Sequence, residues 1–152
     1  MSFDKEWGRE SSSAMKAIRE TYDVISIELF SGVITSSAVG NPSLWKNPKS
    51  APKGYTGGTF RGSWILSFDS PSSDFFSSRS SPESKISIFS SQIKSDKKSR
   101  ARYLTNNLPY SERLEYDAWS KQQPLGVIQP NLSRVNALVP QIESVTNAKY
   151  GV

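Results

Sequence analysis

The chain has 152 residues, a net charge of +5 and a pI of about 9.5, and it contains neither cysteine nor histidine. This length fits one domain with a real core. The missing residue types exclude disulfides, zinc chemistry, Ser-His-Asp triads and Cys-His dyads, and we expect no metal and no cofactor. The basic balance is compatible with nucleic acid nearby but does not establish nucleic-acid binding.

Membrane and export signals are not visible in the sequence. No apolar run approaches the roughly 18 residues of a membrane span. The first ten residues, MSFDKEWGRE, are charged from the start and lack the apolar stretch of a signal peptide. We therefore expect a soluble protein that is made in the cytoplasm and makes no membrane contact.

The first predicted element is a long helix from about Phe3 to Ala38. Apolar and aromatic residues recur there at steps of three and four, which is the period of one helix face. These residues are Ala14, Ile18, Tyr22, Ile25, Leu29 and Val33. Gly40, Asn41 and Pro42 follow as a stop signal, so the helix should end before them.

A long loop is predicted from about residue 40 to 58. Residues 41–58, NPSLWKNPKSAPKGYTGG, are rich in proline, lysine and glycine, which leaves little room for regular structure. A loop of this length indicates a functional loop or one that a partner orders. Trp45 lies in its middle, and tryptophan is a favoured interface anchor.

Three strands are expected to form a small antiparallel sheet. TFRGSWILSFD (59–69), SKISIFSSQI (84–93) and ARYLTNN (101–107) are the candidates, the first two because apolar residues alternate along them. The connector at about 69–84 is serine-dense, since 14 of the 33 residues from Ser67 to Ser99 are serine. That composition predicts a flexible hairpin tip.

Two more helices are predicted after the sheet. In NNLPYSERLEYDAWSKQQP, residues 106–124, Pro109 suits the first turn of a short helix and Asn107 suits its N-cap. A last helix is expected from about Pro130 to Ala148, bent at Pro140. Its apolar stripe would be Val135, Leu138, Ile142 and Val145.

The elements together predict one α+β domain over residues 1–152. It has a long N-terminal helix, a small antiparallel sheet with an extended hairpin and loops, a short helix, and a C-terminal helix packed on the sheet. Such a domain would carry long loops at about 40–58 and 69–84.

Motifs of catalysis are weak. Glu112 and Glu115 lie three apart on a predicted helix, which fits a general acid–base pair, but a solvated helix face explains two nearby glutamates better. GYTGGTFRG, residues 54–62, has glycines without the Lys-Ser/Thr pair of a nucleotide loop. A turn before a strand explains that segment better.

Basic residues are more organised than the acids. Between Leu29 and Phe68 there is no acid, while KSDKKSRAR, residues 94–102, carries five positive charges against Asp96. The acids concentrate in the first helix and at 112–117. This separation fits either a positive face that meets nucleic acid or an acidic subunit, or simply solvated loops. The candidate contacts to a DNA channel or acidic partner are Lys94, Lys97, Lys98, Arg100 and Arg102.

Aromatic residues in 106–124 suggest an interface. Tyr110, Tyr116 and Trp119 are amphipathic aromatics of the type that dominates interface hot spots. The alternative is that Tyr110, Leu114 and Trp119 close the local core. The residues suspected at a subunit interface are Trp45, Arg61, Trp64, Tyr110, Arg113, Glu115, Tyr116 and Trp119.

TGGTFRGSW at 56–64, followed about fifty residues later by TNNLPYSERLEYDAWSKQQPLGVI at 105–128, resembles the tail completion, or neck, proteins of long-tailed bacteriophages. That family shows a Thr-Gly-x-Leu-Arg-x-Ser pattern and then Asn-x-x-Pro-Tyr-Ala-x-x-Leu-Glu-Tyr-Gly. The matching residues are Thr56 or Thr59, Gly57, Gly58, Arg61 and Ser63, then Asn107, Pro109, Tyr110, Leu114, Glu115 and Tyr116. Ser111 replaces the usual alanine, and Asp117 replaces the usual glycine.

The resemblance implies a structural virion protein with an α+β fold and no catalytic activity. It implies a ring, with six copies as the expected number, between the tail tube and the head connector. Tail terminator proteins have a similar architecture, and the sequence does not separate the two roles. The implied partners are further copies, the head-connector and tail-tube proteins, and non-specifically the genomic double-stranded DNA. The implied location is the virion neck, after assembly in the host cytoplasm.

Two other functions stay open at this point. The basic segments also fit a small nucleic-acid-binding protein. A hydrolytic enzyme that uses Glu112 and Glu115 is the weakest alternative.

Overall fold

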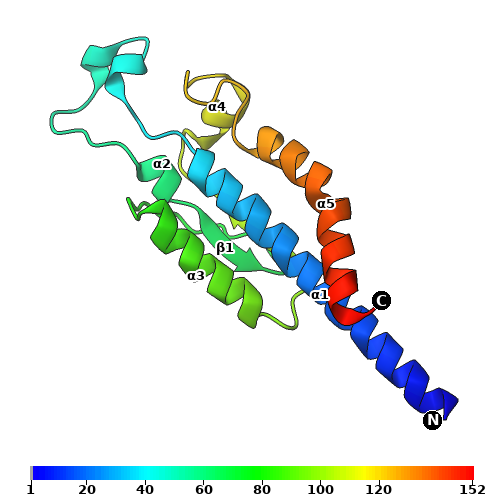
Figure 1. Cartoon of the computed structure of the whole chain (residues 1–152). Helices are drawn as coiled ribbons and strands as arrows, with labels where there is room; N and C mark the ends of the chain where they lie inside the picture. Colours follow the sequence, from blue (N-terminus) through cyan, green and yellow to red (C-terminus); the bar gives the residue numbers. More distant parts are fainter. Residues whose placement is uncertain (1) are drawn as a thin grey trace.

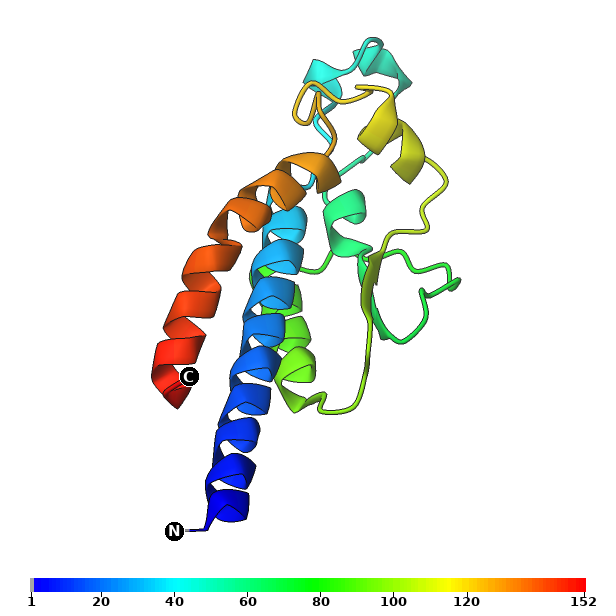
Figure 2. The ribbon, with the colours of Figure 1, turned by 90° about the vertical axis from the view of Figure 1, so that its right-hand side faces the viewer.

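The long first helix is the central element of the fold in the computed structural model, which describes residues 2–152. The elements are α1 (Phe3–Ser36), the 3-10 turns η1 (Pro42–Leu44) and η2 (Pro48–Ser50), α2 (Thr59–Gly62), β1 (Ile65–Phe68), α3 (Pro82–Ser95), β2 (Arg102–Thr105), α4 (Ser111–Tyr116) and α5 (Ile128–Tyr150). Helix α5 lies along one side of α1, and α3 with the sheet lies on the other (Figures 1 and 2). The predicted α+β class with a long N-terminal helix is confirmed.

Helix α1 buries a different set of residues from the predicted stripe. The buried residues are Ala17, Asp23, Ser26, Phe30, Val33 and Ile34. Because α3 and α5 cover α1 from two sides, its buried surface is not a single apolar stripe. Ile18, which was expected on the buried face, is 62% exposed.

Helix α5 packs on α1, not on the sheet as predicted. The sheet has only two strands of four residues, too small to cover a helix of 23 residues, whereas α1 matches that length. Gly32 permits the close approach, because a Cβ there would collide with the side chain of Asn131. Further along, the hydroxyls of Thr21 and Thr146 lie 2.5 Å apart.

The C-terminal helix has the predicted proline but not the full predicted stripe. Pro140 lies inside α5, and the helix curves along α1 (Figure 2). Val135 is buried, but Val145 is 63% exposed and Thr146 is buried in its place. The curved helix therefore turns a more polar face to α1 near its end.

The sheet contains two of the three predicted strands. β1 and β2 pair antiparallel, with Ile65 opposite Thr105 and Phe68 opposite Arg102. The first strand is shorter than predicted, because the chain forms helix α2 directly after Gly58, whose φ is +104°. Positive φ suits a glycine at this helix start.

The predicted strand at 84–93 is wrong, because these residues belong to helix α3. The Ser81 hydroxyl accepts a hydrogen bond from the Ser84 N–H at 3.1 Å, and Pro82 occupies the first turn. Both are helix-start signals. Ile86 and Ile93, seven residues apart, lie on one helical face, whereas the strand prediction rested on the alternation of Ile86 and Ile88. The helix-start signals decide between these two patterns.

The serine-dense connector crosses from β1 to α3 and is not a hairpin tip. Ser78 N–H donates to the Ser63 hydroxyl at 3.1 Å. The Asn107 amide donates to the carbonyls of Ser72 and Asp74, both at 2.8 Å. Asn107 therefore ties down the connector and does not cap α4 as predicted; Tyr110 holds that cap position.

The hydrophobic core lies toward the C-terminal end of α1. Its buried residues are Val33, Ile34, Phe60, Trp64, Leu108, Leu114 and Val127. They come from α1, α2, α4 and the segments beside them, so the segments 56–64 and 105–128 meet here. Within residues 2–152, none of the helices combines the length and apolar character of a membrane span.

Candidate functional site

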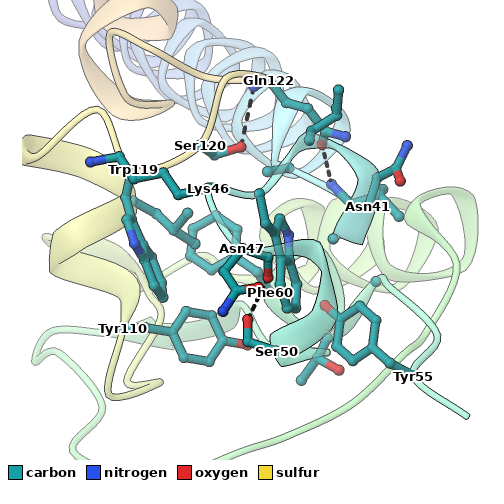
Figure 3. A pocket seen from close by; sticks show the side chains of 18 residues that line it. Asn41, Lys46, Asn47, Ser50, Tyr55, Phe60, Tyr110, Trp119, Ser120 and Gln122 are labelled. Atoms are coloured by element: carbon teal, nitrogen blue, oxygen red, sulfur yellow. Dashed lines mark hydrogen bonds between the residues drawn. The ribbon is translucent and has the colours of Figure 1, made fainter. Parts of the chain in front are cut away.

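A cavity of about 510 Å³ lies beyond the C-terminal end of α1, between the loop at 41–58 and the α4 segment. Five aromatic side chains line it, and we call the site that they form the aromatic groove (Figure 3). They are Trp45, Tyr55, Phe60, Tyr110 and Trp119. The groove therefore joins three of the suspected interface residues with two aromatic residues that the sequence did not single out.

The aromatic side chains of the groove contact one another. Trp45 and Tyr55 meet edge to face, with ring centroids 5.2 Å apart. The ring of Tyr110 lies 6.2 Å from Trp119 and 6.5 Å from Phe60. Burial, and then Tyr55, raises the pKa of Tyr110, so its hydroxyl stays neutral. Trp119 remains 53% exposed, so a large part of its aromatic ring faces solvent.

The end of α1 anchors this groove. Ala38 N–H donates to the Gln123 side chain at 2.6 Å, and Val39 N–H donates to the Gln122 side chain at 3.0 Å. The Arg61 guanidinium donates to the carbonyls of Ser37 at 3.2 Å and Thr35 at 3.1 Å. Helix ends need such partners. Arg61, which was suspected at a subunit interface, thus acts within the chain.

Glu115 caps helix α5. Its carboxylate accepts hydrogen bonds from the N–H groups of Val127 at 2.7 Å, Ile128 at 3.1 Å and Gln129 at 3.4 Å. Gly126 makes this approach possible, because a Cβ at that position would lie 2.6 Å from the carboxyl carbon of Glu115, and its φ is +74°. The interface prediction for Glu115 is therefore replaced by a role inside the fold.

Replacing Glu115 by glutamine should lower the free energy of unfolding by about 1–2 kcal/mol, because α5 loses a charged cap at its positive end. Urea denaturation measures the change. Glu112→Gln is the matched control, since Glu112 is exposed three residues earlier, and it should shift stability by less than about 0.5 kcal/mol. Equal effects of the two variants would contradict the capping role.

The other suspected interface residues divide between core and surface. Trp64 is 4% exposed, and its indole N–H donates to the Ser37 hydroxyl at 2.8 Å, so it is a core residue and not a surface anchor. Tyr116 is 76% exposed. The Arg113 guanidinium carbon lies 5.9 Å from the Trp119 ring centroid, beside the groove.

Arg102 is not a surface cation. Its side chain is 1% exposed and pairs with Asp23 at 2.6 Å and Asp96 at 3.3 Å. The guanidinium also lies 4.0 Å from the ring centroid of Tyr22. The prediction that Arg102 contacts DNA or an acidic partner is therefore wrong. Lys94, Lys97, Lys98 and Arg100 do lie exposed around the turn from α3 to β2.

The acids of the first helix are partly used inside the fold. Glu20 pairs with Lys149 at 2.8 Å, and Glu28 pairs with Arg134 at 3.2 Å. Asp23 pairs with Arg102. Part of the charge separation seen along the sequence is thus neutralised by contacts between α1 and later segments.

Within the described part of the chain, acidic side chains do not line the aromatic groove. Its polar lining consists of amides, hydroxyls and Lys46. Over residues 2–152, acidic side chains do not form a cluster of three that could hold a metal ion. A scan against protein-family models, a search of curated proteins and a search of solved structures gave no match to the chain.

Proposed function

We propose that this protein is a structural component of the phage neck. It completes the tail and joins the tail tube to the head connector, as a ring around the DNA channel. The observation that carries the proposal is that the two segments resembling tail completion proteins, 56–64 and 105–128, meet at one end of the fold and together border the aromatic groove.

The residues that match the tail completion pattern have structural roles in this fold, which is a reason for a protein of this fold to carry them. Arg61 holds the end of α1, Leu114 lies in the core, and Glu115 caps α5. Ser63 is fully buried and holds the connector. Tyr110, in contrast, turns toward the groove. The resemblance therefore covers both a scaffold and one exposed surface.

A ring protomer needs two different surfaces, because each copy contacts one neighbour with one patch and the next neighbour with another. The aromatic groove supplies one such patch. The exposed cations at the α3–β2 turn suit non-specific contact with DNA in the channel, which needs no base recognition. The proposal covers the completion and the terminator role, since both place a ring at the end of the tail.

Native mass spectrometry of the purified protein and of virion necks should show closed rings, with six copies as the expected number. The physical reason is that a groove with a half-exposed tryptophan is stabilised by burial against a neighbour. A chain that stays monomeric at tens of micromolar and is absent from virions would end the proposal.

The four exposed cations favour one second candidate, a small nucleic-acid-binding protein. The variant Lys94→Gln/Lys97→Gln/Lys98→Gln/Arg100→Gln separates the two, with Arg102 left unchanged because it is buried. Duplex binding by a monomer that is weakened by salt and lost in this variant would favour the second candidate. Rings that form equally well in the variant would favour the neck protein.

A further inference from the structure

One end of α1 projects from the body of the protein. Helix α5 runs back along α1 and makes its last ties at Glu20 and Thr21, through Lys149 and Thr146. Residues 3–16 of α1 extend past that point into solvent (Figures 1 and 2). We call residues 3–16 the projecting helix.

The projecting helix carries an apolar stripe whose large side chains are exposed. Phe3 and Trp7 stack on each other, with ring centroids 6.4 Å apart, and are 76% and 64% exposed. At about 100° per residue, Ala14 and Ile18 continue the same face. Met15 lies beside them and is 65% exposed. Such a row of large apolar side chains marks a contact surface.

Charge is sorted around this stripe. By the same helical geometry, Asp4, Glu6 and Glu10 flank the stripe on its two sides. The three basic residues of the projecting helix fall on the opposite face. They are Lys5, Arg9 and Lys16. The charged residues that border the apolar stripe are therefore all acids.

The aromatic groove is complementary to the projecting helix in both polarity and charge. Its wall is aromatic, and Lys46 is among its lining residues. The loop that forms one side also carries Lys49 and Lys53 and contains no acid. Arg113 lies over Trp119 on the other side. An apolar stripe edged with carboxylates fits a groove edged with ammonium and guanidinium groups.

The projecting helix cannot reach the groove of its own chain. The two lie at opposite ends of α1, whose 34 residues span about 50 Å (Figure 2). We infer that the projecting helix of one copy docks in the aromatic groove of the next copy. This contact is head to tail, so it closes a ring where the rotation between copies allows closure. The inference rests on the proposed ring and names its subunit contact.

A mixing experiment tests this contact. The helix variant Phe3→Ala/Trp7→Ala keeps an intact groove, and the groove variant Lys46→Glu/Trp119→Ala keeps an intact helix. Each variant alone should be monomeric by native mass spectrometry. An equimolar mixture should give 1:1 dimers and nothing larger. The only intact pair in the mixture is the projecting helix of the groove variant and the aromatic groove of the helix variant. An interface that uses the same patch on both copies would not give this result.

Matched controls separate this contact from a general loss of apolar surface. Phe75→Ala/Leu125→Ala removes side chains that are 67% and 76% exposed elsewhere, and this variant should assemble like the unaltered chain. Circular dichroism should show the helix variant folded, because alanine is a better helix former than the residues it replaces. Loss of assembly in the control as well would overturn the inference.

Cross-linking gives a second measurement, since the chain has no cysteine of its own. Ser11→Cys on the projecting helix should cross-link through a bismaleimide to Asn47→Cys in the groove of another copy. Ser133→Cys, exposed on α5, should not cross-link to Ser11→Cys. Equal cross-linking to both positions would overturn the inference.

The outcomes also separate the inference from the proposed function. Rings formed by the helix variant would overturn the docking contact and leave the neck assignment standing. Head-to-tail dimers from the mixture, made by a protein absent from virions, would support the contact and overturn the neck assignment. A strict monomer in every preparation would overturn both.

Discussion

Replacing Arg102 by glutamine should lower the free energy of unfolding by about 3–5 kcal/mol, as expected when one partner of a buried ion pair is removed. Its guanidinium is almost fully buried between Asp23 and Asp96, and it also lies over the ring of Tyr22. The glutamine side chain would leave Asp23 without its cation. Urea denaturation at neutral pH measures the loss.

Arg100→Gln is the control for this variant. Arg100 is two residues away, is exposed, and should change stability by less than about 0.5 kcal/mol. If the Arg102 variant kept full stability and instead lost affinity for DNA, the buried ion pair would not be what holds this part of the fold.

Acid should weaken the same cluster. Burial alone would raise the pKa of Asp96, but hydrogen bonds from Ser99, from the Lys98 N–H and from Arg102 outweigh it and hold the pKa well below the usual 3.8. The ionised carboxylate therefore stabilises the fold fully above pH 3.8, and this contribution is lost as the pH falls toward the lower folded-state pKa. Asp96→Asn should make stability less dependent on pH in that acidic range.

Replacing Trp64 by alanine should cost about 3–5 kcal/mol of stability, the usual range for a large aromatic side chain in a core. The ring is 4% exposed and meets Phe60 edge to face, with centroids 5.6 Å apart. The indole N–H would no longer satisfy the Ser37 hydroxyl. Thermal and urea unfolding would measure the effect. Trp64→Phe should cost less, because it keeps most of the buried ring.

Trp119→Ala offers the opposite comparison. Trp119 is 53% exposed in the aromatic groove, so its loss should leave the stability of the monomer within about 0.5 kcal/mol. The same substitution should weaken self-association. If Trp64→Ala were harmless to stability and Trp119→Ala severe, the assignment of core and surface to these two tryptophans would be wrong.

The helical periodicity of apolar residues predicted the two long helices, because the pattern repeats over many residues in each of them. The first helix was expected to end near Ala38 and ends at Ser36, and the last helix differs from its predicted bounds by two residues at each end. The prediction for residues 84–93 was wrong because the alternation of only two isoleucines, Ile86 and Ile88, is too short a pattern to define a strand. The Ser81-Pro82 start signal was the stronger indication there.

Side-chain roles were harder to predict because they depend on contacts between distant segments. The sequence showed that Trp45, Tyr110 and Trp119 were unusual, and the structure places all three in one groove. It did not show that Arg102 would meet Asp23, 79 residues earlier. Chemical type alone cannot separate a surface arginine from a buried one.

Two further features are present in the sequence, but their roles depend on residues that are distant along the chain. Gly126 before α5 and Glu115 on α4 form one cap, but the ten residues between them hide that relation along the sequence. Phe3 and Trp7 were counted into the first helix without regard to what could cover them. Whether these two side chains are covered depends on where α5 ends along α1, which only the tertiary structure shows.

The pairing of α1 with α5 has a consequence for synthesis on the ribosome. Helix α1 is synthesised before its longest partner, α5, so the Thr21–Thr146 contact can form only after residue 146 has left the ribosome. Until then the nascent chain holds an uncovered helix. Chains that are interrupted before α5 therefore expose the α5-facing surface of α1 and are prone to aggregation.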